Sequence, residues 1–205
     1  LIRLFAAWLV IYGHAWAITG SAGGDLVTHL TRFKFAGGVA VDVFFFISGF
    51  LIAASLARND VRSYLASRAL RILPALVVCV ALSVFVLGPL LTTADDYWRD
   101  PMTWDYLWAN SSLWASRYTL PGVFQALPQQ AVNGSLWTLP IEARLYLALL
   151  VASLLGVLTA RRYTPLWAIA MAAAYAFAAW RNPLPEWLAN YVWCTAFFIT
   201  GTRAS

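Results

Sequence analysis

Six apolar stretches, each close to the length of a membrane-spanning helix, limit the folds that this sequence can adopt. A transmembrane helix needs about 20 mostly apolar residues, and a helix satisfies its own backbone hydrogen bonds where lipid offers none. We therefore expect an all-α fold, a polytopic transmembrane helix bundle with about six spans in this segment. The predicted spans are residues 3–20, 36–57, 72–91, 136–160, 163–180 and 187–202.

The composition supports this expectation. Of the 205 residues, 61% are hydrophobic and 11% are charged, whereas soluble domains carry about 25% charged residues. No repeat or low-complexity linker divides the sequence, so we expect one membrane domain over residues 1–205. Cys79 and Cys194 fall inside apolar runs, which favours two buried thiols over a disulfide. The first residue is not Met and the sequence stops soon after an apolar run, which indicates a segment of a longer protein.

The distribution of charge predicts the orientation. With a cytoplasmic N-terminus, eight basic residues lie on the inner side and five on the outer side, as the positive-inside rule requires. This count holds only if residues 104–120, which are aromatic and polar, form an interfacial or half-inserted helix and do not span. We expect a multi-pass protein of the cell inner (plasma) membrane.

Ionisable side chains inside the predicted spans are the strongest pointer to function. Each costs at least about 2.5–3.5 kcal/mol at bilayer depth and usually faces a bundle interior. His14 lies eleven residues from the inner surface, while Asp42 and Glu142 each lie about six residues from the outer surface. These depths converge in the outer half of the bilayer. Because a neutral imidazole can accept a proton from a hydroxyl and a carboxylate can orient it, these three residues are candidate catalytic residues of one polar pocket.

A structural interpretation stays open for each of these residues. His14 could donate to a backbone carbonyl and hold two helices together, while Asp42 or Glu142 pairs with Arg144. Arg144 lies about 200° around the helix from Glu142 and is interpreted as structural.

Arginine residues at the inner surface suggest a phosphate-bearing ligand. Arg3 and His14 share one helix face about 16 Å apart. Arg68 and Arg71 are three residues apart, so on a helix their guanidinium groups project together and suit bidentate contact with phosphate oxygens. The alternative is that they anchor the protein to lipid phosphates. Pro74 is expected in the first turn of the following span.

Several familiar motifs are missing from the sequence. It has no glycine-rich phosphate loop, no H-E-x-x-H, no C-x-x-C and no G-x-S-x-G, and we expect no metal. Nucleic acid is not an expected partner, because the basic residues gather at the inner membrane face.

Four motifs together resemble the acyltransferase-3 family of integral membrane acyltransferases. The family's opening R-x10-H signature is similar to RLFAAWLVIYGHAW, and its second-span motif is similar to GGVAVDVFFFISGFLI. Its R-x-x-R-I-x-P segment resembles RALRILPA, and its SLW-x-L-x-x-E-x-x-x-Y element resembles VNGSLWTLPIEARLYL. The four occur in the family's order and spacing, from Arg3 to about Tyr146.

The resemblance implies that the whole protein has about ten spans, of which this chain supplies the N-terminal part. It also implies the transfer of an acyl group. An acyl group, commonly acetyl, would pass from cytoplasmic acyl-CoA (acetyl-CoA) to a hydroxyl of an extracytoplasmic glycan or glycolipid of the cell envelope. His14 would be the catalytic general base or the acyl carrier, and the sequence leaves both routes open. Asp42 and Glu142 match acidic positions of the family.

For the donor, the resemblance implies that Arg3, Arg68 and Arg71 bind the CoA end of acyl-CoA.

Two other classes of function remain open on the sequence. One is a transporter or flippase of a glycan or lipid precursor that uses the ionisable residues as a relay, and the other is a non-catalytic multispan subunit. The acceptor, the acyl chain length and the oligomeric state are not predicted.

Overall fold

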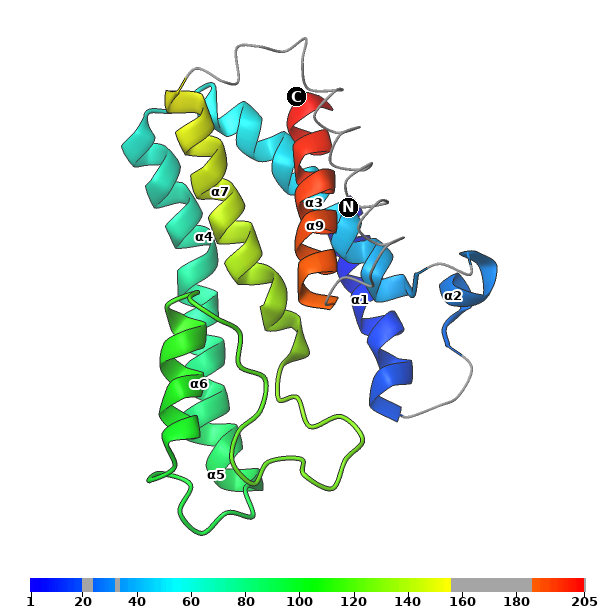
Figure 1. Ribbon diagram of the computed structural model, residues 1–205, viewed down its shortest axis with the longest axis vertical. Coiled ribbons are helices and arrows are strands. Elements are labelled where there is room, and N and C mark those ends of the chain that lie inside the picture. Colours follow the sequence, from blue (N-terminus) through cyan, green and yellow to red (C-terminus); the bar gives the residue numbers. More distant parts are fainter. Residues whose placement is uncertain (20–23, 32–33, 156–185, 205) are drawn as a thin grey trace. The chain divides into compact units, whose positions relative to one another are not determined.

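The computed structural model describes residues 1–19, 24–31, 34–155 and 186–204, and all regular elements in these ranges are helices (Figure 1). The all-α prediction is confirmed for this part of the chain. The elements are α1 (Ile2–Thr19), α2 (Leu26–Thr31), α3 (Ala36–Leu56), α4 (Val61–Leu82), η1 (Ser83–Leu87), α5 (Gly88–Leu91), α6 (Pro101–Ser111), η2 (Gly134–Trp137), α7 (Thr138–Leu154) and α9 (Glu186–Ala204).

Three helical segments in the described ranges are long and apolar enough to cross a membrane: Ala36–Leu56, Val61–Leu91 and Gly134–Leu154. They correspond to the predicted spans that begin at residues 36, 72 and 136. α1 and α9 are helices at two further predicted spans but are not among these three. The predicted span 163–180 lies outside the described residues, so the expected number of about six spans is not confirmed.

The second of these segments differs from the prediction at its start. α4 begins at Val61, well before residue 72, and Pro74 lies inside it. The expectation that Pro74 occupies a first turn is therefore wrong. The helix continues through Pro74, although proline has no N–H to donate to the carbonyl of Leu70 and its ring crowds that carbonyl.

Residues 104–120 do not form one helix. α6 starts at Pro101, where the Asp100 carboxylate accepts the backbone N–H of Met102 at 2.8 Å, a typical N-cap. It ends at Ser111, and Leu113 follows with a positive φ of 58°. With 11 residues, α6 is too short to cross a bilayer, which takes about 20.

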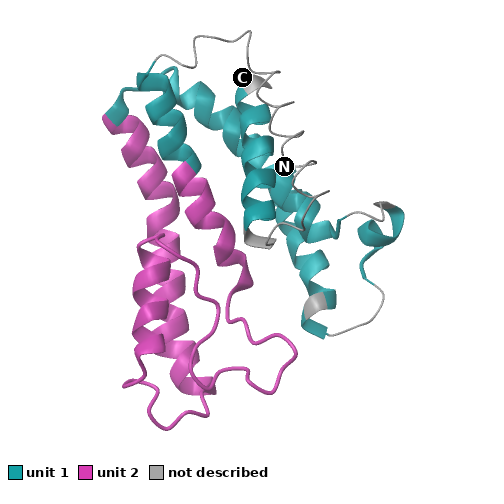
Figure 2. Cartoon of the chain, viewed as in Figure 1, with its two compact units in different colours: residues 1–61, 145–205 teal, residues 62–144 magenta. Residues whose placement is uncertain are grey.

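The described residues form two compact units, shown in teal and magenta in Figure 2. Unit 1 comprises Leu1–Val61 and Leu145–Ser205, and unit 2 comprises Arg62–Arg144. Unit 1 therefore contains α1, α2, α3, α9 and α7 from Leu145 onward. Unit 2 contains α4 from Arg62, followed by η1, α5, α6, η2 and the start of α7.

Unit 2 is built on a core that joins the C-terminal half of α4 to the segments that follow it. The π-helical turn η1 brings the carbonyl of Val84 to the hydroxyl of Tyr97, which donates to it at 2.9 Å. Burial raises the pKa of Tyr97 to about 12, so this hydroxyl stays a donor at neutral pH. The buried core residues are Leu76, Val80, Val84, Tyr97, Tyr106, Leu120, Val123 and Leu136.

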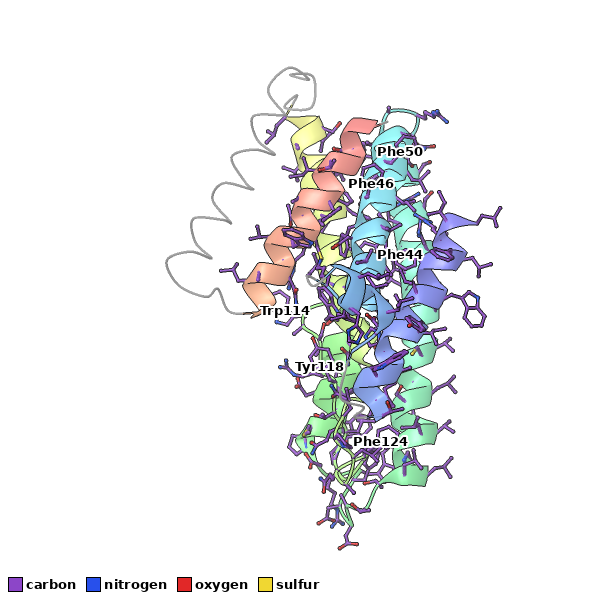
Figure 3. The ribbon with its side chains drawn as sticks, turned by 90° about the vertical axis from the view of Figure 1, so that its right-hand side faces the viewer. Phe44, Phe46, Phe50, Trp114, Tyr118 and Phe124 are labelled. Carbon is purple, nitrogen blue, oxygen red and sulfur yellow. The ribbon has the colours of Figure 1, made fainter. Side chains whose placement is uncertain are left out.

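Unit 1 depends on close approach of α3 to α9, and two glycines permit it. A β-carbon at Gly49 on α3 would fall on the carbonyl of Phe198, and one at Gly201 on α9 would fall on the carbonyl of Phe46. Figure 3 labels Phe46 and Phe50, the two α3 residues whose backbone faces Gly201. Small residues serve this purpose in membrane helix pairs, where backbone contact replaces the hydrophobic effect.

Replacing Gly49 or Gly201 by valine should separate α3 from α9. Overpacking costs about 1–3 kcal/mol in a core where side chains can shift, and here the obstacle is backbone, so we expect at least that loss. Thermal unfolding of the purified protein in detergent measures it. Gly134→Val is the matched control, because no atom lies within 4 Å of its β-carbon position; equal Tm losses in all three variants would contradict the packing role.

Candidate functional site

His14 lies on α1, where its imidazole bonds to its own helix. Nδ1 and the carbonyl oxygen of Val10, one turn earlier, are 2.8 Å apart. Because a carbonyl only accepts, Nδ1 carries the proton in the neutral ring, and Nε2 then holds a free lone pair. The bond to a carbonyl that the sequence suggested is present, but it lies within one helix and does not join two. The arrangement leaves the Nε2 lone pair available to accept a proton.

The surroundings of His14 are formed by the crossing of α1 and α3. A β-carbon at Gly13 would fall on the backbone nitrogen of Gly37, and one at Gly37 would lie 3.1 Å from both Nδ1 and Cε1 of His14. The imidazole is therefore packed against the first turn of α3. Phe35, just before that helix, meets the imidazole edge-on, with 5.6 Å between ring centroids and 75° between planes.

Asp42 lies on α3 and is 7% exposed, and its carboxylate is paired. Both oxygens accept from Lys34 Nζ at 2.7 Å. The same ammonium lies 4.8 Å from the ring centroid of Trp193 on α9, within the range of a cation–π contact. The sequence analysis did not identify Lys34 as the partner of Asp42; the available signal was a cation shortly before a span that contains one carboxylate.

Arg144 has a different partner from the ones that its charge suggested. Its Nη2 donates to the backbone carbonyl of Trp114 at 2.8 Å, and Figure 3 shows Trp114 on the segment after α6. The bond ties α7 to that segment inside unit 2. This is a structural contact, as expected for Arg144.

The remaining predicted site residues divide between the two units. Arg3 is in the first turn of α1, on the same uninterrupted helix as His14. Arg68 and Arg71 are both on α4, with Arg68 half-buried and Arg71 exposed. Glu142 is half-buried on α7, one turn after Leu139, which packs on the core of unit 2.

The structure therefore brings His14, Phe35 and the first turn of α3 together inside unit 1. It also joins Asp42 to Lys34 and Trp193 inside the same unit. Arg68, Arg71 and Glu142 belong to unit 2. A shared pocket of His14, Asp42 and Glu142 stays a prediction.

Asp25 is a buried carboxylate that the sequence analysis did not identify. It is 1% exposed, and it accepts from the backbone N–H and the hydroxyl of Thr28, at 2.7 and 2.8 Å. Its other oxygen accepts from the N–H of Ala36, the first residue of α3. Burial acts to raise the pKa of Asp25, but the hydrogen bonds from Thr28 and Ala36 outweigh it, so the pKa is lowered. Asp25 thus joins α2 to the start of α3.

The lowered pKa of Asp25 makes the stability of unit 1 sensitive to acid. A carboxyl group with a folded pKa below its usual 3.8 stabilises the fold above that pH, and the contribution is lost as the pH falls through the folded pKa. Asp25→Asn should lower the Tm at pH 7 and flatten its dependence on pH between about 5 and 3. Melting curves in detergent across this range measure both effects.

Asp96→Asn is the control. Asp96 and Arg99 are both exposed and their charged atoms are 3.7 Å apart, and such surface pairs contribute little to the free energy of unfolding. An unchanged acid dependence in Asp25→Asn would contradict the anchoring role of Asp25.

Comparisons with known proteins agree on one family. The family model described as an acyltransferase domain matches residues 1–202. An O-acetyl transferase of Shigella phage Sf6 is 38% identical over 147 residues, which cover 71% of this chain and 42% of that protein. Nodulation protein 10 of Rhizobium leguminosarum bv. viciae is 35% identical over 165 residues, which cover 73% of this chain and 42% of that protein. The chain thus spans less than half the length of these relatives, and no solved structure matches it.

Proposed function

We propose, from the premise that this chain belongs to the acyltransferase-3 family, that the protein containing it is an integral membrane O-acyltransferase. The reaction would move an acyl group, with acetyl as the first candidate, from cytoplasmic acyl-CoA to a hydroxyl of an extracytoplasmic glycan or glycolipid. The name of the Shigella phage relative, an O-acetyl transferase, supports the acetyl group.

The observation that carries the proposal is the state of His14. Nδ1 is bound to the Val10 carbonyl, so Nε2 is the free base of a neutral imidazole. In direct transfer, Nε2 takes the proton of the acceptor hydroxyl while its oxygen attacks the thioester carbonyl. The carbon–sulfur bond breaks, and the CoA thiolate receives the proton from the imidazolium. In the two-step route, Nε2 attacks the thioester carbonyl and the carbon–sulfur bond breaks, which releases the CoA thiolate. The acceptor oxygen then attacks the acyl carbon, the carbon–nitrogen bond breaks to restore the imidazole, and the hydroxyl proton passes to the thiolate.

The arginines would bind the donor. Arg3 and His14 share one uninterrupted helix, on the same face and about 16 Å apart, a distance that an extended pantetheine arm can bridge. Arg68 and Arg71, three residues apart on α4, are suited to the CoA phosphates by their planar, always charged guanidinium groups. With a cytoplasmic N-terminus, all three lie on the side from which CoA arrives.

The two acids would have different roles. Asp42 is already neutralised by Lys34, so we assign it to the support of the site and not to proton transfer with His14. Glu142 is half-buried and is proposed to hydrogen-bond the acceptor, which would enter from the outer side. The protein would act in the inner (plasma) membrane.

Loss of the base should abolish the reaction. In the whole protein, His14→Ala should lower acylation of the glycan in cells at least about 100-fold, the range of positioned acid–base groups. Membrane insertion is checked by immunoblotting of the membrane fraction. His29→Ala is the matched control, because His29 is the other histidine of the chain and is exposed on α2. Acylation that persists in His14→Ala would exclude His14 as the base or acyl carrier.

Loss of the arginine pair should weaken donor binding. A charged hydrogen bond contributes about 1.5–3 kcal/mol, so Arg68→Gln with Arg71→Gln should raise the Kd for CoA about tenfold or more, measured by calorimetry in detergent. Arg58→Gln, an exposed arginine at the end of α3, is the control. An unchanged Kd in the double variant would assign the pair to lipid phosphates instead.

A further inference from the structure

We propose that Lys34 is a positioning residue for His14: through its ion pair with Asp42 it holds Phe35 against the imidazole. The inference rests on the proposed role of His14, and it assigns functions to two residues that precede α3.

The ion pair fixes the head of the Lys34 side chain. A carboxylate inside a membrane span is costly without a partner, and Asp42 is nearly inaccessible at 7% exposure. Lys34 Nζ contacts both of its oxygens at 2.7 Å and also lies over Trp193 of α9 at 4.8 Å. The ammonium group is therefore held by α3 and α9 together. Breaking the pair would leave the nearly buried Asp42 carboxylate without a counter-charge, which is strongly destabilising.

The backbone beside Lys34 is held from its other end as well. α3 begins at Ala36, and the N–H of Ala36 donates to the Asp25 carboxylate. Phe35 lies between these two anchored neighbours in an extended conformation, with φ −75° and ψ 161°. Asp42 thus holds Lys34, and Asp25 holds Ala36. Together these contacts fix the direction of the Phe35 side chain, which lies between them in the sequence.

Phe35 connects the ion pair of Lys34 and Asp42 to the proposed base, because its ring contacts the imidazole of His14. Its ring meets the imidazole of His14 edge-on at 5.6 Å and lies beside both glycines of the α1–α3 crossing, Gly13 and Gly37. The Val10 carbonyl holds Nδ1 of the imidazole, and the phenyl ring blocks part of the space in which the imidazole could rotate. The orientation of a catalytic group strongly affects the reaction rate, since a misplacement of about 1 Å can lower that rate about 100-fold.

The experiment measures kcat and the KM for the acyl donor in the purified whole protein. Lys34→Met removes the charge and keeps most of the length, whereas Lys34→Arg keeps the charge. Phe35→Leu removes the ring, whereas Phe35→Tyr keeps it. Because Lys34→Met leaves Asp42 unpaired and could misfold, the double variant Lys34→Met with Asp42→Asn removes both charges. Phe35→Leu leaves the ion pair untouched.

We expect Lys34→Met, the double variant and Phe35→Leu to lower kcat about 10- to 100-fold while the donor KM changes less than about twofold, the signature of an interaction needed in the transition state and not in binding. Lys34→Arg and Phe35→Tyr should recover most of the lost kcat. A merely structural pair would change Tm and the amount of folded protein, without this separation of kcat from KM and without rescue.

Two control variants match the changes in kind. Phe50→Leu removes an aromatic ring of comparable exposure, 37%, from the far half of α3, and Arg99→Met breaks the exposed pair with Asp96. Wild-type kcat in the double variant and in Phe35→Leu would overturn the inference, as would equal losses in Phe35→Leu and Phe50→Leu. His14→Ala is measured in parallel: activity retained there overturns the proposed function, whereas an inactive His14→Ala beside fully active Lys34 and Phe35 variants overturns only the positioning role.

Discussion

A carboxylate buried in an apolar helix has to be neutralised from within the protein, and in this chain that constraint organises the start of α3. Asp42 is nearly buried, and the Lys34 side chain extends along α3 to pair with it. The position of Lys34 then limits the path of the chain into α3. Trp193 joins α9 to the same ammonium group, so that one ion pair connects the loop, α3 and α9.

Close approach of helix backbones at glycine residues also stabilises unit 1, in addition to the ion pair. Gly49 and Gly201 bring α3 against α9, and Gly13 and Gly37 bring α1 against α3. In lipid, apolar side chains gain little by meeting one another, so helices associate through close packing and polar contacts. α3 is thus the central helix of unit 1, with polar contacts toward its N-terminal end and glycine contacts toward both partners.

These features give the proposed chemistry a physical basis. An imidazole that donates through Nδ1 to its own helix keeps Nε2 available, and the Phe35 ring lies against that imidazole. In the proposed reaction, the arginine at the start of the same helix would bind the phosphates of the donor. The proposed site would then have a binding group and a base on one helix, and rigid elements hold such groups more accurately than loops do.

The sequence by itself determined the helical class, the residues from which the three membrane-crossing segments are built, and the motif that puts Arg3 and His14 on one helix. These follow from local hydrophobicity and helix period, which need no knowledge of the rest of the fold. Other features were decided only by the tertiary structure. The partner of Asp42 is Lys34 and not Arg144, Phe35 contacts His14, and Asp25 binds the first residue of α3. Each depends on where a loop residue lies relative to a neighbouring helix, and neither periodicity nor composition specifies that. The extension of α4 through Pro74 was missed for a related reason: hydropathy marks the part of a helix that lipid can cover, whereas the helix itself ends only where its backbone hydrogen bonds do.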